Sequence, residues 1–175
     1  MKKKLLENPE ILFPAPVALL SVSNFEGTKE NIITLAWVGV ICSKPKLLSV
    51  SIRKERFSYN LVKESGFFVL NFPTAKQLQA VKICGSKSGK NFDKFKECNF
   101  TSKKGSKCSA PIIVECPINL ECKIVKILPA EEIGSHEIFI AEIIATHTCE
   151  TFENAVDIDT LVFNCGDYGK VTKID

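Results

Sequence analysis

Short apolar stretches recur along most of the chain, and their composition predicts strands. They are rich in valine, isoleucine, leucine and phenylalanine, and turn-forming residues separate them, as is typical of buried strands. The predicted strands cover residues 16–23, 31–41, 47–53, 67–72, 120–124 and 136–147. Most of the chain is therefore expected to fold as β-structure.

The last two of these strands have the clearest facial patterns. In 120–124, Glu121 and Lys123 share one face and apolar residues share the other, because successive side chains of a strand point to opposite faces. The stretch 136–147 is apolar on both faces apart from its ends and Glu142. Such a strand needs cover on both sides, which a second subunit would provide.

Helical spacing is limited to residues 56–64, 74–83 and 92–97, where Thr74 is a suitable N-cap and Gly66 a suitable stop. Strands and helices do not alternate, and no G-x-G-x-x-G follows the first strand, which argues against a doubly wound parallel sheet. The pattern predicts a mainly β fold, a β-barrel with a few short peripheral helices. No linker or repeat interrupts it, so we expect a single domain over residues 1–175.

Composition and charge narrow the function classes. Hydrophobic residues make up 45% of the chain, and the net charge of +3 favours anionic ligands but is small for a nucleic-acid binder. The first residues begin like a secretion signal, but their apolar run stops at residues 7–9, too early for a signal-peptide core. No stretch approaches the roughly 20 apolar residues of a membrane helix. We expect a cytoplasmic protein that binds neither membrane nor nucleic acid.

The eight cysteines form no C-x-x-C pair, although zinc and iron–sulfur sites usually contain such pairs. We therefore expect no metal site, and without an export signal we expect no disulfide framework. The cysteines are interpreted as reduced, small apolar side chains. Cys84 is the exception: it opens a glycine-rich loop, so we expect its side chain near a ligand and not in a disulfide.

Polar side chains interrupt the apolar strands at two early places. Asn31, Thr34 and Trp37 lie in a segment otherwise built like a strand, and buried polar groups there need partners from the backbone or a ligand. Arg53 ends the next strand, just before a helix start that contains Ser58. Helix N-termini and arginine both favour phosphate. A satisfied strand entry and a solvated charge run are the structural alternatives for these two segments.

A third polar segment covers residues 84–95 and combines glycines, serines and lysines, a composition that suits an anion. It does not satisfy the nucleotide P-loop pattern, since three residues separate Gly85 from Gly89 and Asn91 follows the lysine. A flexible surface loop is the alternative. The two histidines, His136 and His147, lie on one predicted strand eleven residues apart, a spacing that forms no metal site by itself.

In this order and spacing, the polar segments resemble the flavin reductase domain family, which includes flavoredoxins. The match spans roughly residues 10 to 170. It rests on Asn31-x-x-Thr34-x-Ala36-Trp37, on Ser51-Ile52-Arg53-x-x-Arg56 with Ser58, on the strand 67–72, on Cys84-Gly-x-x-Ser88-Gly89-Lys90-x-x-Asp93-Lys94-Phe95, on Gly134-Ser135-His136-x-x-Phe139-Ile140-Ala141-Glu142 and on the segment 163–168. Many members have Arg-Asp where this chain has Lys90-Asn91.

The resemblance implies an FMN-binding split β-barrel, FMN as cofactor and a homodimer with sites near the subunit interface. It implies no catalytic side chain, because the flavin carries the chemistry, with His136 as the one candidate for a direct role near the flavin or nicotinamide. The cofactor-binding residues that it implies are Asn31, Thr34, Ala36, Trp37, Ser51, Ile52, Arg53, Ser58, Cys84, Ser88, Gly89, Lys90, His136 and Tyr168.

Two functions are consistent with the resemblance. In the first, NAD(P)H reduces the bound FMN, which passes electrons to a free flavin, a ferric complex or a protein. In the second, the chain is a flavoredoxin-type electron carrier with little NAD(P)H activity of its own. The cysteine-rich composition suits a reducing cytoplasm and slightly favours the carrier. Hydrolase chemistry is not indicated, since no nucleophile lies in a recognisable elbow.

Overall fold

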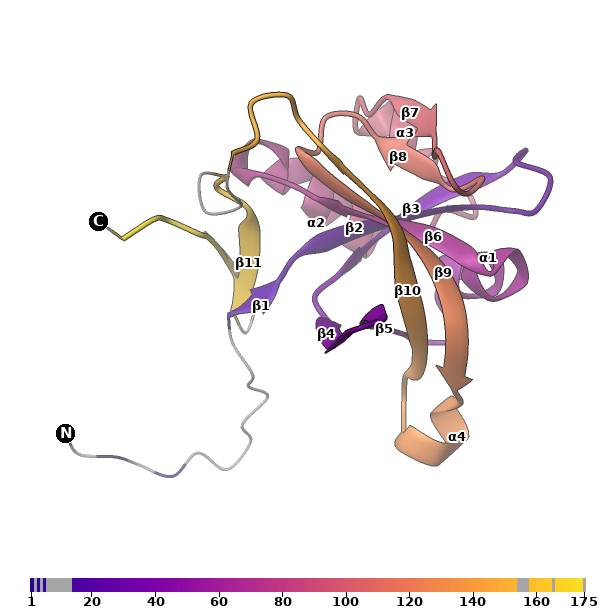
Figure 1. Ribbon diagram of the computed structural model, residues 1–175, viewed down its shortest axis with the longest axis horizontal. Helices are drawn as coiled ribbons and strands as arrows, with labels where there is room; N and C mark the ends of the chain where they lie inside the picture. The colour runs from indigo at the N-terminus through magenta and orange to yellow at the C-terminus, as the bar shows by residue number, and fades with distance from the viewer. Residues whose placement is uncertain (2, 4, 6–13, 154–157, 165, 175) are drawn as a thin grey trace.

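The computed structural model describes residues 1, 3, 5, 14–153, 158–164 and 166–174. Its main element is a seven-stranded antiparallel sheet (Figure 1). In spatial order the strands are β3 (Glu30–Leu35), β2 (Ala18–Ser23), β6 (Phe67–Phe72), β9 (Ile118–Leu128), β10 (Glu137–Thr148), β5 (Lys46–Ile52) and β4 (Val38–Ser43). The prediction of a mainly β fold is confirmed.

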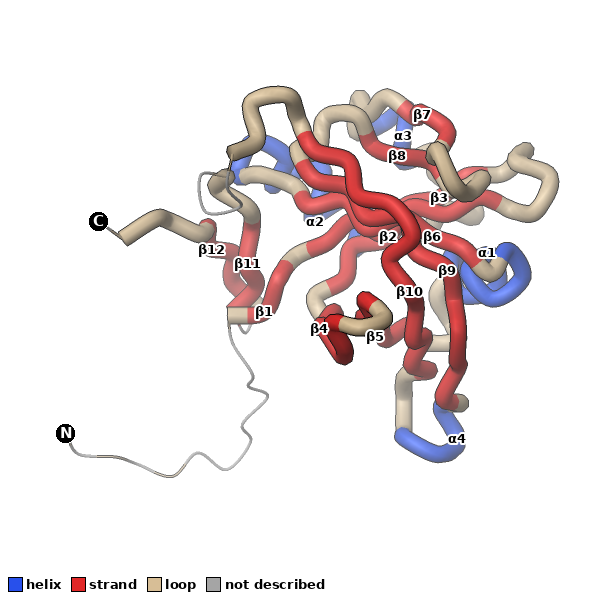
Figure 2. Tube along the Cα trace, in the orientation of Figure 1, coloured by secondary structure: helices blue, strands red, loops and turns tan. Residues whose placement is uncertain are grey.

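Two small sheets flank the main one. The first joins β1 (Ala15–Pro16), β11 (Leu161–Asn164) and β12 (Asp167–Lys170), and the second joins β7 (Ser102–Lys104) and β8 (Pro111–Ile113). Figure 2 shows that strands dominate and that the helices are short and lie around the sheet. None of the described helices is long and apolar enough to cross a membrane.

Residues at the helix ends explain where α1 ends and where the helical segment before α2 begins. They are α1 (Phe57–Ser65), a 3-10 turn (Ala75–Gln77), α2 (Leu78–Ser86), α3 (Lys94–Glu97) and α4 (Ala130–Ile133). Gly66 ends α1 with a φ of 71°, and its N–H donates to the Val62 carbonyl, the left-handed cap that glycine adopts without strain. Thr74 and Gln77 form a capping box before α2. The helix α4 joins β9 to β10 at the tip of a long hairpin (Figure 1).

The prediction of one strand over residues 31–41 is wrong, because the chain turns at Ala36 and Trp37. The strand β3 pairs with β2, whereas β4 pairs with β5 at the opposite edge of the main sheet. The Trp37 carbonyl accepts a hydrogen bond from the Ser51 amide at 3.1 Å, and the Val38 amide donates to the Ala36 carbonyl at 3.0 Å. This turn leaves the Trp37 side chain 60% exposed at a corner of the sheet.

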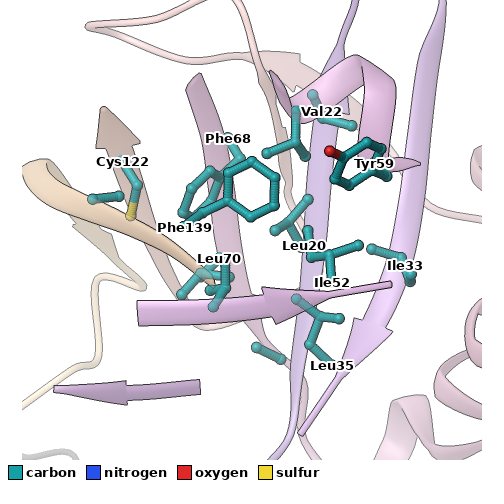
Figure 3. Packing of buried hydrophobic residues seen from close by; sticks show 14 of the residues in the cluster. Leu20, Val22, Ile33, Leu35, Ile52, Tyr59, Phe68, Leu70, Cys122 and Phe139 are labelled. Atoms are coloured by element: carbon teal, nitrogen blue, oxygen red, sulfur yellow. The ribbon is translucent and has the colours of Figure 1, made fainter. Parts of the chain in front are cut away.

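Apolar clusters cover both faces of β2, which explains its continuous apolar sequence. On one face, side chains from β2, β5, β6 and β10 point toward one another, among them Leu20, Ile52, Phe68 and Phe139 (Figure 3). On the other face, Val17 and Leu19 pack with residues of α2 and α3. The strand therefore lacks the alternation of a half-buried strand.

Glu121 lies on the face of β9 that the sequence assigns to it, yet it is completely buried. Its carboxylate accepts hydrogen bonds from the backbone amides of Ser106, Lys107 and Cys108 at 2.7 to 2.9 Å. His147 Nε2 lies 2.6 Å from the same carboxylate. The loop of residues 105–108 thus covers a position that the strand pattern alone leaves at the surface.

Candidate functional site

Two adjoining clefts lie where β3, β5, α2 and the β11–β12 hairpin meet. The larger has a volume of about 450 Å³ and the smaller about 90 Å³. They share Ile33, Arg56, Gly85 and Ser86. Because they share these residues, the two clefts form one continuous recess.

The clefts bring together nearly all residues that the sequence predicts for a site. The larger is lined by Thr34, Ala36, Trp37, Ser51, Ile52, Arg53, His136 and Tyr168. The smaller is lined by Asn31, Ser58, Cys84, Ser88 and Gly89. Lys90 is exposed and lines neither cleft. Their roles as ligand contacts stay a prediction, but segments far apart in the chain do converge here.

Aromatic side chains line the larger cleft, and we call Trp37, His136, Phe163 and Tyr168 the aromatic wall. The rings of Trp37 and His136 are nearly parallel, with centroids 6.0 Å apart and an interplanar angle of 11°. Phe163 lies 6.5 Å from Trp37 and 5.5 Å from Tyr168, again between centroids. Such a wall offers extended π-surface to a planar ligand.

His136 is held between a serine and an arginine. Arg53 Nε donates to His136 Nε2 at 3.4 Å, and Ser135 Oγ lies 2.9 Å from Nδ1. Since Nε2 accepts, the proton of the neutral ring is assigned to Nδ1. Burial, together with the positive charges of Arg53 and Arg56, lowers the pKa of His136 below its usual range. These surroundings therefore favour the neutral form of the imidazole.

The clefts are cationic. Arg53, Arg56 and Lys82 line the larger one, and no carboxylate is among the described residues that line it. Arg56 also lines the smaller cleft, with Lys87 and Lys94, and these three cations outnumber the one carboxylate of its lining, Glu55. Guanidinium groups form paired hydrogen bonds with phosphate oxygens, so the recess suits an anionic ligand.

Buried hydrogen bonds fix the wall of the smaller cleft. Asn31 Nδ2 donates to Ser58 Oγ at 2.6 Å, which joins β3 to the first turn of α1. A Cβ atom on Gly89 would overlap Asn31 Oδ1, so only glycine allows this approach of loop and strand. Lys94 is buried, and its Nζ donates to the carbonyls of Ile32 and Cys84 at 2.6 and 2.7 Å. Burial lowers the pKa of Lys94.

A family model described as "Flavin reductase like domain" matches residues 11–172. The chain belongs to the flavin reductase-like family. An uncharacterised protein of Archaeoglobus fulgidus is 33% identical over 171 residues, which cover 97% of this chain and 93% of that protein.

Solved structures agree with this assignment. The flavoredoxin of Desulfovibrio vulgaris (Miyazaki F) has a TM-score of 0.90 at 26% identity, covering 99% of this chain and 95% of the flavoredoxin. An FMN-binding protein from Thermus thermophilus, solved with p-hydroxybenzaldehyde, has a TM-score of 0.83 at 21% identity and covers 100% and 98% of the two chains. The predicted split-barrel fold of the flavin reductase-like family is confirmed.

Several residues that line the two clefts were not among the predicted contacts. Arg56 and Lys94 belong to the polar segments described above, so the motifs themselves could have identified them. Phe163 opens the C-terminal segment of the resemblance. Lys82 lies inside a predicted helix with no motif around it, and only the packing of α2 against β3 shows its place.

Proposed function

We propose that the two clefts bind one FMN molecule, with its ring system against the aromatic wall and its phosphate toward the smaller cleft. The observation that carries this proposal is that the aromatic wall lines one of two adjoining clefts and the loop with Lys87, Ser88 and Gly89 lines the other. The larger volume, about 450 Å³, lies within the ~300–1,000 Å³ typical of small-molecule sites. The Thermus thermophilus protein with the same fold is itself described as FMN-binding.

The residues around the recess divide into two roles. Trp37 and Tyr168 supply apolar surface for the ring system, and Arg53 places positive charge beside it. Arg56, Ser58 and the loop that carries Ser88 supply donors for the phosphate. When bound, FMN supplies the two-electron chemistry. His136 lies next to Arg53 and orients a co-substrate beside the ring system.

The protein passes electrons from NAD(P)H through bound FMN to a flavin, ferric or protein acceptor, as a single-domain cytoplasmic enzyme. A flavoredoxin-type carrier with little NAD(P)H activity is the second candidate. The similarity to the Desulfovibrio vulgaris flavoredoxin, at a TM-score of 0.90, favours that alternative. The described cysteines are all free, as a reducing compartment would keep them.

The visible absorption spectrum of the purified protein, followed by anaerobic addition of NADH or NADPH, tests both candidates. Flavin bands that bleach on addition support the reductase. Bands that persist until dithionite is added support the carrier. A colourless protein that also fails to take up added FMN would refute the proposed cofactor.

The homodimer is also a proposal, and the edge strand β4 supports it. Val40 and Ile41 are 85% and 49% exposed on this strand, beside the exposed Trp37. An unpaired edge strand with apolar side chains is a ready surface for a second chain. Dimerisation through β4 would bring the partner close to the mouth of the larger cleft.

Val40→Lys is expected to raise the dimer dissociation constant by at least about tenfold, because it places a charge in an apolar contact. Light scattering across a concentration series would measure the change. Val125→Lys is the matched control, since Val125 is 50% exposed on β9, away from β4. A dimer unaffected by Val40→Lys, or a monomeric parent protein, would contradict this proposal.

Gly89→Ala is expected to weaken FMN binding by about tenfold, because the new Cβ would displace Asn31 from Ser58 and change the wall of the smaller cleft. Equilibrium titration with FMN would measure the effect. Gly39→Ala is the control, since its Cβ meets nothing closer than Ser49 Oγ at 3.9 Å. Equal affinities of Gly89→Ala and the parent protein would show that this wall does not contact the ligand.

A further inference from the structure

Two thiols lie in van der Waals contact at the smaller cleft, and one of them, Cys84, belongs to its lining. The Sγ atoms of Cys84 and Cys98 are 3.8 Å apart. Cys84 is in the last turns of α2, and Cys98 directly follows α3. Asn99, the next residue, has a φ of 53°, so the chain leaves α3 through a left-handed turn directly after Cys98.

The segment between these cysteines forms part of the proposed binding site. Ser88, Gly89 and Lys94 all line the smaller cleft. Lys94 Nζ donates to the Cys84 carbonyl at 2.7 Å, so a hydrogen bond already ties the start of the segment to a residue near its end. A covalent bond between the two sulfur atoms would close the segment into a ring.

Contrary to the sequence-based expectation that Cys84 stays out of a disulfide, we propose that Cys84 and Cys98 form a reversible disulfide, which closes the loop of residues 85–97 around the smaller cleft. This adds a redox site made of the chain's own side chains, distinct from the proposed cofactor. The disulfide itself is independent of the proposed function, whereas its effect on ligand binding rests on that function.

The two thiols differ in their exposure to solvent. Cys84 is 1% exposed, while Cys98 is only partly buried. Burial raises the pKa of Cys84 to about 12, and the nearby Lys94 ammonium acts in the opposite direction. Burial also raises the pKa of Cys98, and Lys94 again opposes the rise. Because Cys98 is the more exposed, a soluble disulfide reacts with Cys98 first, and Cys84 then attacks the resulting mixed disulfide.

A low-molecular-weight disulfide such as oxidised glutathione is the oxidant. The Cys98 thiolate attacks one sulfur of the reagent, forms a mixed disulfide and releases one thiolate. The Cys84 thiolate then attacks Cys98 Sγ, forms the Sγ–Sγ bond and releases the second thiolate. Both cysteine protons pass to the two released thiolates, and the reagent takes up two electrons. Excess free thiol reverses both steps.

The test is incubation of the purified protein with oxidised glutathione, alkylation of the remaining thiols, and peptide mapping without reduction. The expected product is a cross-linked pair of peptides containing Cys84 and Cys98, with a mass lower by two hydrogen atoms, and dithiothreitol should restore both thiols. A glutathione adduct that stays on Cys98, or a cross-link only between other cysteines, would overturn the proposal.

Variants separate the pair from the other cysteines. Cys98→Ser should abolish the cross-link, and Cys84→Ala should leave a stable glutathione adduct on Cys98. Cys149→Ser is the matched control, because Cys149 is exposed and its loss should leave the cross-link intact. An unchanged cross-link in Cys98→Ser would overturn the assignment even if Cys84→Ala fails to fold.

The effect on the loop is measured by FMN titration of the reduced and oxidised protein. The ring restricts the free loop before binding, so we expect the oxidised form to bind FMN about three- to tenfold more tightly. Equal affinities would overturn the coupling between disulfide and cleft. Failure of both forms to bind FMN would refute the proposed cofactor, while the peptide map would still decide the disulfide.

Discussion

Arg56→Ala is expected to lower the affinity for FMN by roughly 10- to 150-fold. Arg56 is the cationic residue that lines both clefts. A hydrogen bond to a charged group contributes ~1.5–3 kcal/mol, and each 1.4 kcal/mol corresponds to about a factor of ten in affinity. Equilibrium titration followed by flavin fluorescence would give the dissociation constant of each variant.

Three further variants test whether the loss of affinity depends on the guanidinium group and on the position of Arg56. Arg56→Lys should recover only part of the affinity, because lysine keeps the charge but loses the planar fork. Arg53→Ala should have a smaller effect than Arg56→Ala, since Arg53 lines only the larger cleft. Lys103→Ala, at an exposed position on β7, should bind as the parent does. An unchanged dissociation constant for Arg56→Ala would show that the phosphate is held elsewhere.

Glu121→Ala is expected to reduce the free energy of unfolding by about 3–5 kcal/mol, the usual cost of breaking a buried charged network. The substitution leaves the amides of Ser106, Lys107 and Cys108 without their acceptor. Urea denaturation would measure the loss. The control is Glu64→Ala, an exposed carboxylate on α1, and a similar small loss in both variants would contradict the role of Glu121.

The same carboxylate predicts how stability depends on acid pH. Burial alone would raise the pKa of Glu121, but hydrogen bonds from His147, Ser106 and Lys107 lower it to about 2 from an ordinary value of 4.5. A depressed folded pKa stabilises the fold above the unfolded pKa. We expect this contribution to decline as the pH falls from about 4.5 to about 2. Glu121→Gln should flatten this part of the stability profile, and an unchanged slope would contradict it.

The sequence predicted the central strands well, because β2, β5 and β6 are short, strongly apolar and bounded by turn residues. It could not locate the turn at Ala36 and Trp37, since no glycine or proline marks it and apolar residues continue on both sides. The short strands β7 and β8 have too few residues to show a period. Their pairing depends on tertiary contacts.

The sequence indicated which segments contribute residues to the candidate site, but not how these segments are arranged in space. The motifs identified residues from β3, β5 and the loop after α2, and the structure places them around the same two clefts. The burial of Glu121 was not predictable, because the loop above it contains glycine, serine and lysine, a composition typical of a solvent-exposed loop. The contact between Cys84 and Cys98 likewise depends on how two short helices pack.

The turn at Ala36 and Trp37 also places a natural fluorophore in the larger cleft. Trp37 is the single tryptophan of the chain, and it lies in the aromatic wall with 60% of its surface exposed. Its ultraviolet emission therefore originates at the recess itself, with no background from indoles elsewhere in the fold. Occupation of the larger cleft should quench this emission and shift it to shorter wavelength. Every variant described above can be titrated without an added label.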